Sequence, residues 1–363
     1  MTEMPSNEDL QLLVDLVSTP SVSGDEAAAS ALLVEHMNGA GFDAHVDEAG
    51  NACGLRRGPE APDGAPRRSL VLLGHIDTVP GEIPVRVEDG VLHGRGTVDA
   101  KGPLAAFARA VARVEPAPGV DLLVVGAVEE EVHTSKGARH LRDSLPAPDA
   151  CIIGEPSGWD AVTLAYKGCL RLRATYAAPV GHSAGPLPPV AEAAAELWQA
   201  VKAWCADFNA PHDRLYDQLL PSLQEFVTET DGLEERVGLA IGLRLPPGFE
   251  VAELEALARE HSGGGEVELY GHEPAWGSRA GTPLARALRR SILSAGGEGS
   301  FKRKTGTSDM NVVGPTWGCP IVAYGPGDSS LDHRPDERVE VAEYGRAIEV
   351  LAGALVGGGW ATS

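Results

Sequence analysis

In the first part of the chain, apolar residues occur both with helical spacing and in short continuous runs. Leu10, Leu13, Val14 and Val17 recur with the spacing of one helix face, which predicts an amphipathic opening helix. Short continuous apolar runs are typical of strands that are covered on both faces. Such runs occur at residues 69–74, 121–128, 150–154 and 320–324. Because helical stretches lie between them, the pattern predicts an α/β fold with a mostly parallel sheet.

The pattern changes after about residue 162. Leu170, Leu172 and Ala174 alternate with polar residues, and this period of two predicts a sheet with one solvated face. A long helix at 190–208 and further strands at 237–244 and 266–270 are expected next. The α/β pattern returns at about residue 280. The expected domains are a discontinuous catalytic domain of residues 1–162 and 280–363, and an inserted α+β domain of residues 163–279.

Charge and composition exclude several classes of function. The formal net charge of -22 argues against nucleic acid or an anionic membrane as the partner. No apolar run reaches the length of a membrane span, and residues 1–9 lack the pattern of a signal peptide. The 5 cysteines are scattered without a CxxC pair, so we expect reduced thiols in a cytoplasmic protein.

Residues of the types that bind metals follow each predicted core strand. They are His75 and Asp77 after the first run, Glu129 to Glu131 after the second, Glu155 after the third and His333 after the fourth. Asp99 lies in a glycine-rich loop at 94–102. One such residue alone is usually a solvated loop residue or a helix cap. Together they predict a site at one sheet edge, because ligands bind at the carboxyl ends of parallel strands. Histidine and carboxylate ligands without thiolates suit zinc, cobalt or manganese.

The order of these motifs resembles that of the M20 metallopeptidases and deacylases. The motifs are residues 16–24, 74–80, 94–102, the acidic triplet, 153–156, 306–309 and 325–328 leading to His333. Each motif alone is weak, but the full series in this order is specific. The resemblance implies a two-metal amide hydrolase that uses Zn²⁺ or Co²⁺, with the insert as a dimerisation or lid domain.

The resemblance also implies a role for each residue. Asp99 would bridge two metal ions, with His75 and Glu155 completing one site. His333 and one carboxylate of the acidic triplet would complete the other. Asp77 would hold the far ring nitrogen of His75 and so fix its tautomer. A second triplet carboxylate would act as general base on the metal-bound water and then protonate the leaving amine.

The acidic triplet allows two assignments. The family usually has Asp-Glu-Glu, whereas this chain has Glu129, Glu130 and Glu131. The separation from Glu155 in relatives favours Glu130 as the base and Glu131 as the ligand. The alternative, with Glu129 as the base and Glu130 as the ligand, stays open.

Two residues of the insert also match family positions. His182 matches a histidine that, in dimeric relatives, reaches the partner's active site and stabilises the oxyanion. The simpler interpretation is a loop histidine without a function. Arg244 matches a position that often contacts the substrate carboxylate. The resemblance therefore implies a homodimer.

Within the family, the chain resembles most the branch from the amino-group-carrier-protein route to lysine. Residues 95–103, 154–159 and 301–311 carry that resemblance. Those enzymes release lysine, or in some cases ornithine, from the terminal glutamate of a small acidic carrier protein. The basic run Lys302, Arg303 and Lys304 is a candidate docking site for such a carrier. It is equally compatible with a solvated loop, and the net charge of -22 opposes approach at long range.

The same motifs are also compatible with other functions. The nearest is a deacylase of N-acetyl-ornithine or N-acetyl-lysine. A succinyl-diaminopimelate desuccinylase or a dipeptidase is more distant. A metal-dead binding protein on this fold is disfavoured, because every candidate ligand and the base are present.

Overall fold

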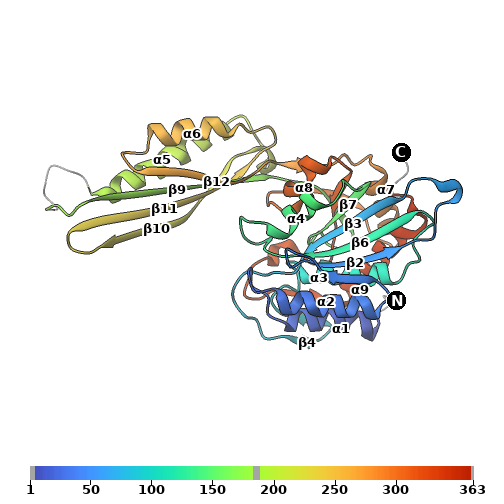
Figure 1. Ribbon diagram of the computed structural model, residues 1–363. Helices are drawn as coiled ribbons and strands as arrows, with labels where there is room; N and C mark the ends of the chain where they lie inside the picture. Colours follow the sequence, from blue (N-terminus) through green and yellow to red (C-terminus); the bar gives the residue numbers. More distant parts are fainter. Residues whose placement is uncertain (1–4, 183–188, 361–363) are drawn as a thin grey trace. The chain divides into compact units, whose positions relative to one another are not determined.

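The structure is a computed structural model that describes residues 5–182 and 189–360 (Figure 1). The chain forms two compact units. The first comprises Met1–Ala165, Gly277–Arg303 and Ser308–Ser363, and the second comprises Tyr166–Trp276 and Lys304–Thr307. The first unit is therefore interrupted by the second.

The described part of the first unit is built around one large sheet. Its order is β1 (Asp43–Val46), β2 (Ala52–Arg57), β6 (Val120–Ala127), β3 (Arg68–His75), β7 (Ala150–Gly154), β15 (Ile321–Ala323), β8 (Ala161–Tyr166) and β13 (Trp276–Gly277), with β14 (Ser300–Lys304) paired to β8. The central strands β6, β3, β7 and β15 are mutually parallel. Their neighbours β2 and β8 pair with them antiparallel. The four predicted apolar runs are these four central strands, so the prediction of a mostly parallel α/β sheet is confirmed.

Helices on both faces explain why these strands are continuously apolar. In β7 every residue is buried. The helices α1 (Asn7–Ser18), α3 (Lys101–Ala112) and α9 (Val341–Leu355) lie on one face of the sheet, and α4 (Lys136–Ser144) and α8 (Asp309–Trp317) lie on the other (Figure 1). The opening helix α1 buries Leu13 and Val17, as its spacing predicts. Its capping box, formed by Ser6 and Asp9, satisfies the first backbone N–H groups.

The second unit is a four-stranded antiparallel sheet with two helices on one face. The strands run in the order β10 (Leu220–Thr230), β11 (Glu234–Leu245), β9 (Gly168–Pro179) and β12 (Glu266–Glu273). The helices are α5 (Val190–Asn209) and α6 (Val251–Glu260). Leu170 and Leu172 of β9 pack with Leu197 and Val201 of α5 in a separate core. The period-two alternation therefore marks the buried face of β9, as expected.

The first unit also contains α2 (Ala27–Gly39) and α7 (Pro283–Ser294), which contribute buried residues such as Leu33 and Leu288 to its core. A small sheet consists of β16 (Arg338–Glu340), β5 (Val91–His93) and β4 (Arg86–Glu88). Within the described residues, no helix is both long and apolar enough to cross a membrane. The 5 cysteines, all in described segments, form no disulfide.

Candidate metal centre

The parallel strands place three candidate ligands at one edge of the sheet. His75 is the last residue of β3 and is in register with Ala127, the last residue of β6. Gly74 pairs with Gly154 at the end of β7, so Glu155 follows at the same edge. Glu131 comes 4 residues after β6 ends. This edge is where open α/β sheets place their ligands.

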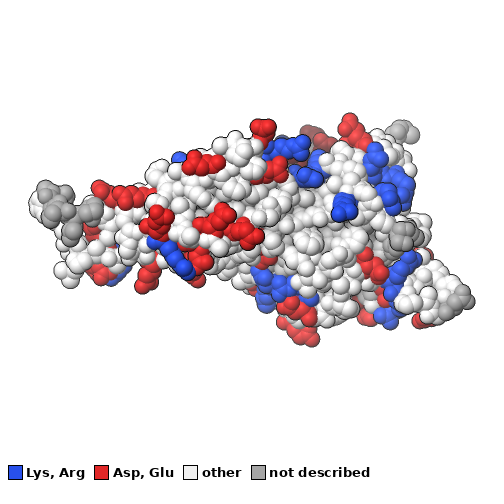
Figure 2. All heavy atoms as spheres, turned by 90° about the horizontal axis from the view of Figure 1, so that it is seen from above, with Lys and Arg blue, Asp and Glu red and all other residues white. Residues whose placement is uncertain are grey.

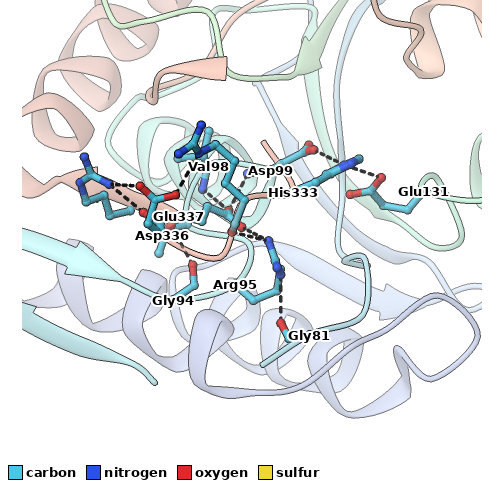
Figure 3. Close-up of polar contacts among 12 residues, drawn as sticks. Gly81, Gly94, Arg95, Val98, Asp99, Glu131, His333, Asp336 and Glu337 are labelled. Atoms are coloured by element: carbon cyan, nitrogen blue, oxygen red, sulfur yellow. Dashed lines mark hydrogen bonds and ion pairs between the residues drawn. The ribbon is translucent and has the colours of Figure 1, made fainter. Parts of the chain in front are cut away.

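Asp99 stands between two histidines. Its Oδ2 lies 2.9 Å from Nε2 of His333 (Figure 3). Its Oδ1 lies 3.2 Å from Nε2 of His75. The two oxygens of this carboxylate therefore face the imidazole nitrogens of two residues that lie far apart in the sequence. This is the arrangement that a carboxylate bridging two cations needs.

Glu131 completes the group. Its Oε2 lies 3.0 Å from Nε2 of His333, so His333 is placed between Asp99 and Glu131 (Figure 3). Ligand atoms of His75, Asp99 and Glu131 all lie within 4.8 Å of one another. The other oxygen of Glu131 is buried and accepts no hydrogen bond from the described residues. A buried carboxylate oxygen without a donor is costly, so these residues fit a cation.

Asp77 contacts His75 and the backbone of the acidic triplet without belonging to the ligand group itself. Nδ1 of His75 lies 3.0 Å from the carbonyl oxygen of Asp77 and 3.4 Å from its Oδ1. The carboxylate of Asp77 also accepts the backbone N–H groups of Glu130 and Glu131, both at 3.0 Å. The hydroxyl of Ser23 donates to the same carboxylate at 2.7 Å. Asp77 thus orients the His75 ring and fixes the backbone of the acidic triplet.

The three glutamates of the triplet have different surroundings. Glu129 accepts the hydroxyl of Thr134 at 2.7 Å and lies 3.7 Å from Nζ of Lys136. Glu131 instead contacts His333 in the ligand group. Glu129 and His333 both have left-handed backbones, with φ of 58° and 62°. Such conformations are uncommon for residues other than glycine and are frequent at functional sites, although Asp89 and Ser135 of this chain adopt them as well.

Crowded charges shift the pKa values of the centre strongly. Hydrogen bonds to Asp99 and Glu131 raise the pKa of His333 to about 10. Burial alone would lower the pKa of His75, but hydrogen bonds to Asp77 and Asp99 raise it overall. Burial also opposes ionisation of Asp99, yet the two histidines hold its pKa below the usual value. Without metal, protons on the histidines therefore balance the carboxylates.

The pKa of Glu130 departs in the opposite direction from that of Asp99. Burial raises it well above its usual value, and the negative charges of Asp309, Glu155 and Glu131 raise it further, although His75 opposes them. The Glu130 carboxyl group is therefore electrostatically coupled to His75, Glu155 and Glu131. Positive charge in the centre would reverse this effect and favour the ionised carboxylate.

Comparison with known proteins identifies the family. The sequence profile of peptidase family M20/M25/M40 matches residues 71–356. This chain belongs to the M20/M25/M40 peptidase family. A LysW-lysine hydrolase of Deinococcus radiodurans is 45% identical, over 98% of both chains. A protein of Thermococcus kodakarensis, provisionally named LysW-lysine/LysW-ornithine hydrolase, is 40% identical over 96% of this chain and 92% of its own.

A solved structure shares the M20 fold across both units of the chain. The M20 metallo-carboxypeptidase Sso-CP2 of Sulfolobus solfataricus aligns with a TM-score of 0.77 at 18% identity, over 96% of this chain and 99% of that one. The predictions of the M20 family and of an amide-bond metallohydrolase are thereby confirmed.

The remaining predicted site residues of this M20 chain lie in varied settings. Glu155 is buried directly after β7. His182 is exposed, and residues 183–188, which follow it, lie outside the described residues. Arg244 donates to the hydroxyl of Thr307 at 2.7 Å, within the second unit. Among the described residues, the group of ligand atoms within 4.8 Å contains none of these three.

The basic run lies on β14 rather than in a loop. Lys302 donates from Nζ to the carbonyl oxygen of Ser157 at 2.8 Å. Nζ of Lys304 lies 5.9 Å from the ring centroid of Tyr166. Because side chains alternate along a strand, Arg303 points to the opposite face from Lys302 and Lys304. The run is therefore not one continuous patch.

Several residues that support the M20 centre carry no obvious signal in the sequence. Glu26 accepts the backbone N–H groups of Gly24 at 2.7 Å and Glu129 at 3.2 Å. Glu337 accepts the backbone N–H of Asp99 at 3.1 Å. Ser23 and Glu26 lie in or beside the motif at 16–24, which indicates the family but not their contacts.

Metal binding should release protons at pH 8. His333 has a pKa of about 10 in the metal-free protein, so it is protonated there, whereas a metal ligand must be a neutral imidazole. We expect roughly one proton or more to leave per centre filled. Calorimetric titration of zinc into metal-free protein should give heats that scale with the ionisation enthalpy of the buffer. Heats that do not depend on the buffer would show that His333 is already neutral.

Proposed function

We propose that this M20 enzyme hydrolyses the amide bond that joins L-lysine, or L-ornithine, to the C-terminal glutamate of the carrier protein LysW. Support for the substrate comes from the names of relatives that are 45% and 40% identical over nearly the whole chain. The observation that carries the chemistry is the Asp99 carboxylate, whose two oxygens face His75 and His333. A deacylase of N-acetyl-ornithine or N-acetyl-lysine is the alternative.

Two divalent ions, Zn²⁺ or Co²⁺, are proposed at the centre. Asp99 would hold both, with His75 and Glu155 on one side and Glu131 and His333 on the other. When bound, such ions lower the pKa of water and polarise the amide carbonyl. The mixture of imidazole and carboxylate donors without thiolates supports these metals.

Glu130 is the proposed general base. Its backbone N–H donates to Asp77, and its half-buried side chain interacts electrostatically with His75, Glu155 and Glu131. The Glu130 carboxylate would take a proton from the attacking water and pass it to the nitrogen of the leaving amine. The contacts of Glu129 with Thr134 and Lys136 support this assignment over the alternative register.

A pair of matched substitutions tests the base. Glu130→Gln should lower kcat by about 100-fold or more, because proton transfer is lost, and should leave the metal content unchanged. Glu129→Gln is the control and should change kcat by only a few-fold. Steady-state lysine release and elemental analysis measure both quantities. If Glu129→Gln gives the larger loss of kcat, the alternative register is the correct one.

Two sets of cations are proposed to bind the substrate. The Arg244 guanidinium is oriented by Thr307 and can bind the carboxylate of the released amino acid through paired hydrogen bonds. Lys302 and Lys304 on one face of β14, and Arg303 on the other, are proposed to dock the carrier through separate contacts. Lys302 contacts Ser157, 2 residues beyond Glu155, so β14 lies beside the metal edge. On the face seen in Figure 2, basic side chains are more frequent over the first unit than over the second.

Turnover of carrier-linked and acetylated substrates tests the proposed function directly. We expect lysine release from glutamyl-linked LysW to have a far higher kcat/KM than release from N-acetyl-lysine or N-acetyl-ornithine. Zinc or cobalt should be required for both. Comparable turnover of the acetylated compounds would leave an M20 hydrolase but contradict the carrier assignment.

A charge-reversed variant separates docking from chemistry in the same experiment. Arg303→Glu changes an exposed side chain of β14 and should raise KM for the carrier substrate while sparing the acetylated one. Arg259→Glu makes the same change on α6, where the side chain is 75% exposed, and is the control. Equal effects of Arg303→Glu on both substrates would count against docking at β14.

A homodimer is proposed through the second unit, with His182 of the partner subunit serving each centre as an oxyanion donor. The edge strand β10 supports this proposal, because it exposes Leu223, Phe226 and Val227 by 41%, 39% and 50%. Apolar edge strands of this kind are ready to pair with another chain. Sedimentation equilibrium should give the dimer mass for the wild type and a weaker dimer for Phe226→Lys. A monomeric wild type would contradict the proposal.

A cytoplasmic location also stays a prediction.

A further inference from the structure

Glu337 is a buried carboxylate that has no role in the proposed chemistry. It comes 4 residues after His333, just before β16, and its side chain is 0% exposed. Lys and Glu side chains are rarely buried to this extent unless they are fully paired. Both oxygens of Glu337 should therefore have hydrogen-bond donors.

One oxygen of Glu337 holds the backbone beside the bridging aspartate. Oε1 accepts the N–H of Val98 at 2.9 Å and the N–H of Asp99 at 3.1 Å (Figure 3). These two donors belong to the loop that ends where α3 begins. The carboxylate thus occupies the position of a cap for two successive backbone N–H groups, one of which belongs to the proposed bridging ligand itself.

The other oxygen of Glu337 connects this loop to the one that carries His333. Oε2 accepts Nη1 of Arg95 at 2.8 Å, and the same Nη1 donates to the carbonyl oxygen of Arg334 at 3.2 Å. Nε of Arg95 donates to the carbonyl oxygen of Gly81 at 3.1 Å (Figure 3). Arg95 therefore joins the loop after β3 to the backbone of the residue that follows His333.

The network joins the segments that carry three proposed ligands. Gly81 follows His75, Val98 precedes Asp99, and Arg334 follows His333. Glu337 is fully buried, and so are its contacts with the N–H groups of Val98 and Asp99. Removal of its carboxylate would therefore leave these N–H groups unsatisfied. The distance of 2.9 Å between Asp99 and His333 then depends on this support as well as on the ligands themselves.

We propose that Glu337, acting through Arg95, is a positioning residue that holds Asp99 and His333 at the separation needed for one carboxylate to bridge two ions. This inference rests on the proposed metal centre. Its consequence is that the affinity for metal depends on a side chain that touches neither ion. Supporting partners of this kind typically change metal affinity by 10-fold to 100-fold when they are altered.

Glu337→Gln tests the proposal with little change of shape. The amide has one acceptor and one donor side, so it can satisfy either the two N–H groups or Arg95, but not both. Competition titration of zinc into metal-stripped protein should show at least about 10-fold weaker binding, with the second ion affected most. The thermal midpoint of the metal-free protein is measured beside it, so that loss of affinity is separated from loss of fold.

Asp336→Asn is the matched control. Asp336 is the neighbouring acid, about half exposed, and pairs with Arg334 and Arg338. This variant removes the same charge from the same loop and should bind zinc as the wild type does. Arg95→Lys is the second test, because it keeps Glu337 paired but loses the forked contacts to Gly81 and Arg334. It should also weaken zinc binding, even if Glu337→Gln does not fold.

The outcomes separate this inference from the metal centre itself. Zinc affinities of Glu337→Gln, or of Arg95→Lys, that equal that of Asp336→Asn would overturn the positioning role. A wild type that takes up no metal would instead overturn the proposed centre. Weaker zinc binding in both variants, with near-normal thermal midpoints, supports a positioning role over a purely structural ion pair.

Discussion

The candidate metal centre depends on how the negative charge of the Asp99 carboxylate is balanced by positive charge. Asp99 is almost buried, and each of its oxygens faces a histidine, at 3.2 Å and 2.9 Å. In the metal-free chain protons on those histidines compensate the carboxylates, whereas in the loaded enzyme two cations are proposed to do so. The same geometry thus accommodates either form of positive charge, and the surrounding contacts serve to keep that geometry fixed.

The parallel sheet explains where that carboxylate finds its partners. The strands β3, β6 and β7 end in register, so short segments after each strand meet without long loops. Asp77 then links two of these segments, since it contacts His75 and also accepts the backbone N–H groups of Glu130 and Glu131. The sheet thus brings the candidate ligands to one edge, and buried hydrogen bonds then fix their final positions.

The sequence predicts the parts of this arrangement that depend on local pattern. Continuous apolar runs identify the central strands, and a polar residue directly after such a run, as at His75 or Glu155, identifies the edge. The bridging role of Asp99 is implied only by the family resemblance, because its loop follows none of the four central strands. The contacts of Glu337 with Val98 and Asp99 could not be predicted, because they join residues far apart in sequence and use backbone groups, which every residue has.

The interrupted first unit has a consequence for the order of synthesis. His75, Asp99, Glu131 and Glu155 precede the second unit, whereas His333 and Glu337 follow it. A nascent chain emerges from its amino end, so the early ligands leave the ribosome well before the late ones. The first segment also lacks β15, the central strand next to β7. Completion of the proposed centre is therefore tied to completion of the chain, because an unfinished polypeptide lacks His333, one of the five proposed ligands.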